Sequence, residues 1–205
     1  KDSYLTDYIT NNQKVKKKIT SSLNKLDFTD IVFDDESIPF KKESFDLVFS
    51  NLNIQHINKI PQFFVQSYDI LKKNGVFVAS FFGEENLLGL KKATLEAENE
   101  LYGKVSPRFI PVIDLQSAAS LLTKSGFSDP VSSLEIIEVN YSSPINILKD
   151  LKYMGQGNIL NLRDKGLVRK KFLDEILKNY AKISPGKTSG LNLNYEIITV
   201  IGTKT

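Results

Sequence analysis

Three short apolar runs, with one helical stretch between the second and the third, constrain this chain more than any other feature. The runs cover residues 31–33, 45–52 and 76–82, and the apolar positions of residues 61–75 have a helical spacing that ends at Asn74-Gly75. Short buried runs joined through a helix are typical of a parallel sheet that is covered on both faces. We therefore predict an α/β fold.

The residues that directly follow each run are the first site candidates, because ligands of such sheets bind beyond the carboxyl ends of the strands. They are Asp34 and Asp35 after the first run, residues 51–56 after the second and Phe82-Gly83 after the third. From spacing alone, the two acids are as compatible with a soluble turn as with a ligand site.

The composition allows one sizeable core and excludes several kinds of site. The chain has 205 residues, of which 41% are hydrophobic, and this suits one domain with an appended lobe. A net charge of +3 is too small to indicate a nucleic-acid partner. With no cysteine and one histidine, we expect no disulfide and no metal site. No apolar stretch could cross a bilayer and no signal peptide is visible, so we expect a soluble protein without membrane insertion.

The rest of the chain predicts a helical lobe and two more strands. One long helix has an apolar face, and we expect Glu96, Glu98 and Glu100 to be exposed on its other face; the apolar positions are Leu87, Leu90, Thr94, Ala97 and Leu101. Asp114 is expected to cap the next helix, and an outer strand follows over residues 131–141. Further helices are expected from Ser143-Pro144 and over residues 167–182, before a terminal antiparallel strand over residues 191–201.

The motifs of the three runs resemble the middle of a class I S-adenosylmethionine-dependent methyltransferase. The residues that carry this resemblance are Asp34-Asp35-Glu36-Ser37-Ile38-Pro39-Phe40, Ser44-Phe45-Asp46-Leu47-Val48-Phe49-Ser50-Asn51-Leu52 and Leu71-Lys72-Lys73-Asn74-Gly75. A longer set resembles the branch that contains complex I assembly factor 5 and its bacterial relatives. This set includes residues 81–83, 106–108, 139–141, 150–151 with 154–155, and 195–197 with 201–202. The malonyl-carrier-protein methyltransferases of biotin synthesis are a neighbouring branch, which Asn51-Leu52 and Gln55 also resemble.

This resemblance implies a three-layer αβα sandwich with a Rossmann-like, mostly parallel sheet, an antiparallel terminal strand and a helical cap. The core would take residues 1–83, 114–143 and 186–205, and the cap would take residues 84–113 and 144–185.

The resemblance also implies S-adenosylmethionine as cofactor and assigns residues to it. Asp34 would accept a hydrogen bond from the adenine amino group, and the backbone at Asp35 would meet the ring edge. Asn51 and Leu52 would line the methionine moiety. No metal site is implied.

Three residues are candidates for the substrate side. Gln55 and His56 would face the substrate, but His56 stands where relatives usually carry tryptophan, which favours packing over a role as general base. Arg108 is compatible both with a clamp for a substrate anion and with an ordinary surface residue.

One feature of the family is missing from the printed sequence. No glycine precedes Asp34, so the glycine-rich turn that approaches the cofactor is absent, and two strand-helix-strand units cannot fit ahead of Ile31. Either the sequence joins pieces across a stretch between Thr10 and Lys25, or the protein lacks this half of the site. The first explanation is favoured, because a sheet without its inner strands would leave residues 45–52 with an unpaired edge.

Three functions remain open at this point. The first is methyl transfer from S-adenosylmethionine to a small molecule or a protein, which needs alignment of donor and acceptor and no metal. The resemblance to complex I assembly factor 5 implies a second, hydroxylation of an arginine with a respiratory-chain subunit as partner. The third is a binding module that has kept the fold without catalysis. The protein would be cytoplasmic in a bacterium, and in the mitochondrial matrix if the source is eukaryotic.

Overall fold

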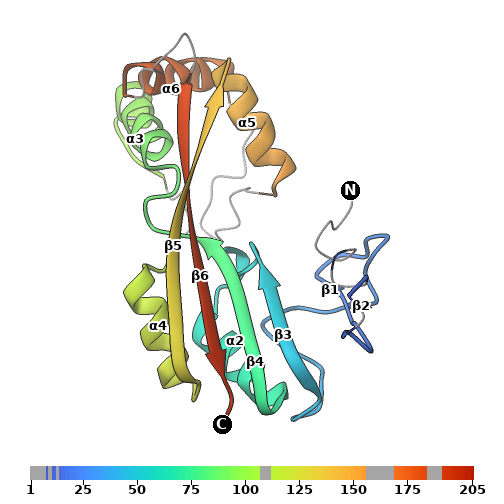
Figure 1. Cartoon of the computed structure of the whole chain (residues 1–205). Coiled ribbons are helices and arrows are strands. Elements are labelled where there is room, and N and C mark those ends of the chain that lie inside the picture. The colour runs from blue at the N-terminus through green and yellow to red at the C-terminus, as the bar shows by residue number, and fades with distance from the viewer. Residues whose placement is uncertain (1–7, 9–10, 13, 107–111, 156–168, 184–190) are drawn as a thin grey trace.

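A four-stranded sheet forms the centre of the fold. The computed structural model describes residue 8 and residues 11–12, 14–106, 112–155, 169–183 and 191–205. The strands are β3 (Phe45–Asn51), β4 (Leu71–Phe82), β5 (Ser128–Tyr141) and β6 (Leu191–Thr203), in the order β3-β4-β6-β5 (Figure 1). β3 is parallel to β4, and β6 is antiparallel to both β4 and β5, so three of the strands share one direction. The predicted α/β fold with a mostly parallel sheet and an antiparallel terminal strand is confirmed.

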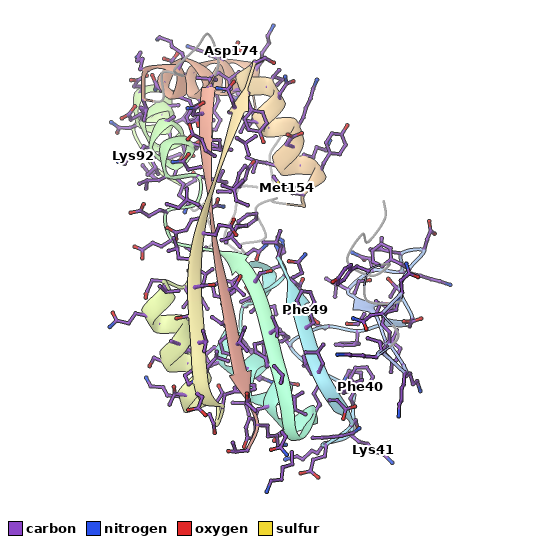
Figure 2. All side chains as sticks on the ribbon, viewed as in Figure 1. Phe40, Lys41, Phe49, Lys92, Met154 and Asp174 are labelled. Carbon is purple, nitrogen blue, oxygen red and sulfur yellow. The ribbon has the colours of Figure 1, made fainter. Side chains whose placement is uncertain are left out.

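Two helices cover one face of this sheet. They are α2 (Ile60–Ile70) and α4 (Leu115–Lys124), and with the 3-10 helix η1 (Ile54–His56) they enclose one hydrophobic core, in which Phe77 and Ile198 are fully buried. Phe49 and Ile201 occupy the alternating positions and are exposed on the opposite face. Phe49 is labelled in Figure 2. Within residues 14–44, which precede β3, there is no helix that could form a layer over that face.

The boundary between α2 and β4 differs from the prediction. The apolar spacing predicts a helix up to Gly75, but α2 ends at Ile70. Leu71 is already extended, with φ −73° and ψ 141°, and pairs with Phe45 of β3. The chain then turns at Asn74, where φ is 62°. Pairing with the neighbouring strand therefore ends the helix before the turn residues do.

A second hydrophobic core lies where β5 and β6 extend beyond the other strands. Helices α3 (Leu88–Tyr102), α5 (Pro144–Tyr153) and α6 (Lys170–Ile183) gather at this end of the sheet (Figure 1). Their buried side chains Ala97, Ile147 and Tyr180 pack with Leu193 of β6. We propose that these helices form the predicted cap, whose boundaries at residues 84–113 and 144–185 stay a prediction.

The expectation that Glu98 is exposed is wrong. Its side chain is 1% exposed and lies on the same face of α3 as Thr94 and Ala97. The Glu98 Oε2 atom accepts a hydrogen bond from the backbone N–H of Ser106 at 2.9 Å. The buried face of α3 therefore includes Glu98 beside the apolar residues. The hydrogen bond from Ser106 offsets part of the cost of burying this carboxylate.

Local signals set the start of two helices as predicted. Asp114 caps α4, because its Oδ1 accepts the backbone N–H of Ser117 at 2.8 Å. Pro144 stands in the first turn of α5, where a missing N–H has no consequence.

The segment before β3 forms a separate pair of short parallel strands, β1 (Ser21–Ser22) and β2 (Ile31–Val32). This pair lies beside β3 and apart from the four-stranded sheet (Figure 1). The strand predicted over residues 31–33 is thus present, but it does not join that sheet. Edge-to-face contacts connect Phe33 with Phe40 and Phe40 with Phe45, at centroid distances of 5.5 and 4.9 Å, and so link this segment to β3.

Candidate functional site

The carboxyl ends of β3 and β4 lie side by side and carry the first group of predicted residues. Leu52 directly follows β3 in a left-handed conformation, with φ 48°, and its backbone N–H donates to the Ser80 carbonyl at 2.7 Å. The Ser80 hydroxyl donates to Asn51 Oδ1 at 2.5 Å. Because this bond occupies the Oδ1 atom of Asn51, the Nδ2 atom is left to donate hydrogen bonds to a ligand.

Asp35 lies close to the same edge and is held by Asn53, a residue of the 51–56 stretch to which the sequence assigned no role of its own. Asn53 Nδ2 donates to Asp35 Oδ2 at 2.6 Å, in a half-buried position. Burial raises the pKa of Asp35, while the Asn53 hydrogen bond lowers it and the charge of Asp34 raises it. Asp35 is therefore a hydrogen-bond acceptor that is oriented by a neighbour and partly shielded from water.

A cavity of about 400 Å³ separates the β1–β2 segment from β3, and Asp35, Asn51 and Asn53 all line it. Its apolar lining includes six phenylalanines: Phe28, Phe33, Phe40, Phe45, Phe49 and Phe63. The hydroxyl of Ser50 also lines it and is buried with no hydrogen-bond partner among the described residues. Aromatic walls with a few polar groups, at this volume, suit a flat heterocycle that carries N–H and O–H groups. The described residues thus fit a nucleoside.

Asp34 lies outside this cavity, at the surface. Its Oδ1 accepts the backbone N–H of Glu36 at 2.9 Å, which closes a tight turn. Its predicted role at the adenine amino group stays a prediction.

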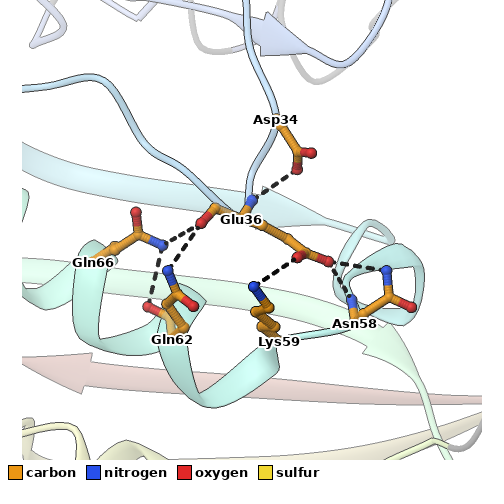
Figure 3. A network of polar contacts seen from close by, with 6 residues as sticks. All are labelled: Asp34, Glu36, Asn58, Lys59, Gln62 and Gln66. Atoms are coloured by element: carbon orange, nitrogen blue, oxygen red, sulfur yellow. Dashed lines mark hydrogen bonds and ion pairs between the residues drawn. The ribbon is translucent and has the colours of Figure 1, made fainter.

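Glu36 anchors the acidic turn to the start of α2 (Figure 3). Its Oε1 accepts both the backbone N–H and the side-chain Nδ2 of Asn58, each at 3.0 Å. Its carbonyl accepts the side-chain amides of Gln62 and Gln66 at 3.2 and 3.1 Å. These bonds hold the turn in which Asp35 stands, and those from Asn58 lower the pKa of Glu36. Sequence reasoning missed this role, which depends on residues more than twenty positions apart.

Gln55 and His56 stand in η1, directly after β3. Gln55 is buried, and its Nε2 donates to the Leu52 carbonyl at 2.6 Å, while its Oε1 is buried with no hydrogen-bond partner among the described residues. Burial lowers the pKa of His56, so the imidazole is neutral near neutral pH. Both substrate-side roles stay predictions. Arg108 lies outside the described residues.

A second cavity, of about 370 Å³, is lined by Leu52, the residue that follows Asn51 of the first cavity. Its walls come from β4, β5, β6 and α5, and they are mostly apolar: Phe82, Ile137, Val139, Tyr141, Tyr153, Met154, Tyr195 and Ile197. Met154, at the end of α5, lies beyond the upper ends of β3 and β4 in Figure 2. Asp150 is the one carboxylate in this lining.

Two tyrosines contribute polar groups to this second cavity beside Asp150. The hydroxyls of Tyr141 and Tyr195 lie 3.0 Å apart and share a hydrogen bond. Burial raises the pKa of both phenols, and the nearby Asp150 acts in the same direction. Both phenols therefore stay protonated in the neutral range, and one of the two protons forms the shared hydrogen bond.

A glycine at the rim of β4 permits a close approach of β6. A Cβ atom at Gly83 would meet Glu196 Oε1 at 2.0 Å, so no other residue fits without moving that carboxylate. Glu196 is buried, and its Oε1 accepts the backbone N–H of Glu85 at 3.4 Å. The expected position of residues 82–83 at a pocket rim agrees with Phe82 in the second cavity.

Comparison with known proteins identifies the family. Residues 2–79 match a family described as a methyltransferase domain. A protein of Rickettsia prowazekii that is named as a methyltransferase, RP459, is 31% identical over 189 residues, which cover 89% of this chain and 83% of that protein. The human mitochondrial arginine-hydroxylase NDUFAF5 is 30% identical over 184 residues, covering 90% of this chain and 53% of that protein.

Other relatives extend this comparison. The malonyl-[acyl-carrier protein] O-methyltransferase of Gallionella capsiferriformans is 30% identical over 165 residues, covering 80% of this chain and 54% of that protein. The chain thus spans about half the length of the human and Gallionella relatives.

Solved structures support the fold. A Bacillus halodurans protein, BH2331, described as a methyltransferase, has a TM-score of 0.56 and 16% identity, covering 92% of this chain and 82% of its own. The YcgJ protein of a Bacillus species has a TM-score of 0.55 and 13% identity, covering 85% of this chain and 70% of its own. At this identity the two structures show the fold alone.

The relatives confirm the resemblance that the motifs indicate. They include the complex I assembly factor 5 branch and the malonyl-carrier-protein methyltransferase branch. S-adenosylmethionine is the cofactor of this family. The chain belongs to the class I S-adenosylmethionine-dependent methyltransferases.

Proposed function

We propose that the protein transfers the methyl group of S-adenosylmethionine to a small molecule or to a protein side chain at the carboxyl ends of β3 and β4. One observation carries this proposal: Asn51 lines the first cavity, and Leu52, the next residue, lines the second. A nucleoside in the first cavity and an acceptor in the second would therefore meet at these two residues. Methyl transfer needs this kind of alignment and no nucleophilic side chain.

Within this proposal, the cofactor-binding candidates have different support. The carboxylate of Asp35 faces the first cavity and is oriented by Asn53, so we assign the hydrogen bond from the nucleoside to Asp35 in preference to Asp34. Asn51 would donate to the methionine moiety, and Leu52 would contact it. The bound cofactor supplies an electrophilic methyl group; the residues of the chain bind, orient and exclude water.

Calorimetry with S-adenosylmethionine on the full-length protein tests the proposal. We expect saturable binding that Asp35→Ala weakens about ten- to a hundredfold, since a hydrogen bond to a charged group contributes about 1.5–3 kcal/mol. Asp46→Ala is the matched control, because Asp46 is an exposed acid at the other end of β3 that pairs with Lys72. A wild-type protein without saturable binding would exclude methyl transfer from this donor and leave hydroxylation or a non-catalytic binding module. Equal effects of both variants would contradict the site.

Hydroxylation of an arginine is the second candidate, and Asp150 favours it. A carboxylate among tyrosines and aliphatic side chains suits a substrate with a long apolar stem and a cationic head. The relatives named arginine-hydroxylase add support, and a respiratory-chain subunit is the partner that we propose with it. Mass spectrometry of the candidate subunit separates the two functions: a methyl group gained on incubation supports transfer, and an oxygen atom gained on an arginine supports hydroxylation.

We propose the bacterial cytoplasm as the location, or the mitochondrial matrix if the source is eukaryotic. Relatives from Rickettsia and from mitochondria support both possibilities. In the described part of the chain, no helix combines the length and the apolar character needed to cross a membrane.

A further inference from the structure

The middle of β5 is an exposed sheet edge with apolar side chains on both faces. β5 stands at the end of the sheet opposite β3 and pairs with β6 on one side; no described strand pairs with its other side. Ile136 is 58% exposed, and Leu134 and Ile137 are each 43% exposed. An open edge of this kind offers unpaired backbone N–H and C=O groups next to apolar surface, which favours the addition of another strand.

The amino-terminal part of β5 is protected against the addition of another strand, and its middle part is not. A bulge interrupts the pairing between Ser128 and Val131, and Pro130 lies inside it without a backbone N–H. Helix α4 lies beside this half of β5, while α3, α5 and α6 gather around its carboxyl-terminal part (Figure 1). From Val131 to Tyr141 the register with β6 is continuous, so residues 134–138 form a regular strand edge between the two groups of helices.

The charge of this edge is acidic. β5 carries Asp129, Glu135 and Glu138 and has no lysine or arginine. On the side of Ile136, a cavity of about 350 Å³ adds the carboxylates of Glu85 and Glu196 to that of Glu138. Lys91, whose amino group donates to the Glu84 carbonyl, is the cation that acts on Glu196. Among the described residues, the surface around the open edge therefore keeps a surplus of carboxylates.

We infer that the edge of β5 from Leu134 to Glu138 docks an extended, basic segment of a partner protein as an added β-strand. On that segment, lysine or arginine alternating with aliphatic residues would pair with Glu135 on one face of the sheet and cover Ile136 on the other. A second copy of the chain is a poorer occupant, because a two-fold pairing would bring two Glu135 and two Glu138 side chains into one interface. The inference does not depend on the proposed methyl transfer.

The test uses a synthetic peptide of about nine residues in which lysine alternates with valine, which is within the usual length of a strand. Fluorescence anisotropy should give saturable binding to the full-length protein, and hydrogen exchange should slow at the backbone amides of residues 134–138. A peptide with glutamate in place of lysine, and one with methylated backbone nitrogens, should not bind. No saturable binding of the lysine peptide, or equal binding of the glutamate peptide, would overturn the inference.

Matched variants locate the site. Glu135→Lys should weaken binding about tenfold by replacing an attractive cross-strand pair with a repulsive one. Glu96→Lys, which makes the same charge change at an exposed position on α3, should leave binding unchanged. Ile136→Thr keeps a β-branched side chain and should weaken binding without unfolding the strand. Equal weakening by Glu96→Lys, or a dimer of the free protein with protected β5 amides, would refute the docking of a basic partner.

Discussion

Asn53→Ala is the perturbation that examines the geometry of the first cavity most closely. Asn53 Nδ2 donates to Asp35 Oδ2 at 2.6 Å, and the variant leaves this half-buried carboxylate without that donor. Hydrogen bonds to charged groups contribute about 1.5–3 kcal/mol. Because Asp35 keeps part of its contact with water, we expect a loss near the lower limit, about 1.5 kcal/mol, in the free energy of unfolding at neutral pH.

The pH dependence of this loss follows from two opposing effects on Asp35. The Asn53 hydrogen bond lowers the pKa of Asp35, so the stability that it provides is present above that pKa and is lost as the pH falls. Burial is the larger effect and raises the pKa above the ordinary 3.8. Asp35 as a whole therefore contributes stability below pH 3.8 that is lost as the pH rises through the folded-state pKa.

Urea unfolding at neutral and acidic pH, with a carboxyl-carbon NMR titration of Asp35, measures both effects. Asn53→Ala should destabilise the protein more at neutral pH than below pH 3.8, and it should raise the pKa of Asp35 further. Asp35→Asn, which keeps an acceptor and removes the charge, is the control and should be at least as stable as the wild type at neutral pH. An equal loss at both pH values, or an unchanged Asp35 pKa in Asn53→Ala, would refute the reasoning.

Three further predictions concern packing and capping. Gly83→Ala should lower the midpoint of thermal unfolding, because its Cβ would meet Glu196 Oε1 at 2.0 Å, and the loss should shrink when Glu196→Ala is also made. Phe77→Ala should lower the free energy of unfolding by about 3–5 kcal/mol, while Phe49→Ala, on the exposed face, should cost far less by the same urea titration. Asp114→Ala should cost about 1 kcal/mol through the lost cap of α4, which Asp114→Asn should largely restore.

The sequence predicts those parts of the fold that depend on local patterns. Apolar runs mark β3, β4 and β6, and the cap at Asp114 marks α4, because strand alternation and capping act within a few residues. The predicted end of α2 is wrong because Leu71 pairs with Phe45 of β3. Helical spacing within α2 carries no information about this contact between strands. Glu98 is buried for a similar reason, since its partner Ser106 lies beyond the helix.

The residues of the candidate site also differ in whether local sequence patterns could predict them. Position after a strand identifies Asp35 and Asn51, which both line the first cavity. Asn53 and the anchoring role of Glu36 depend on contacts between segments 18 to 30 residues apart, and no local spacing marks them. Resemblance to a family supplies the cofactor, which residue patterns alone leave open.

The most direct measurement is a crystal structure of the full-length protein with S-adenosylhomocysteine, the product of methyl transfer. We predict that its nucleoside lies in the cavity of about 400 Å³, within hydrogen-bond distance of the Asp35 carboxylate, with its sulfur directed past Leu52 toward the second cavity. A nucleoside bound away from both Asp35 and Asn51 would contradict this account.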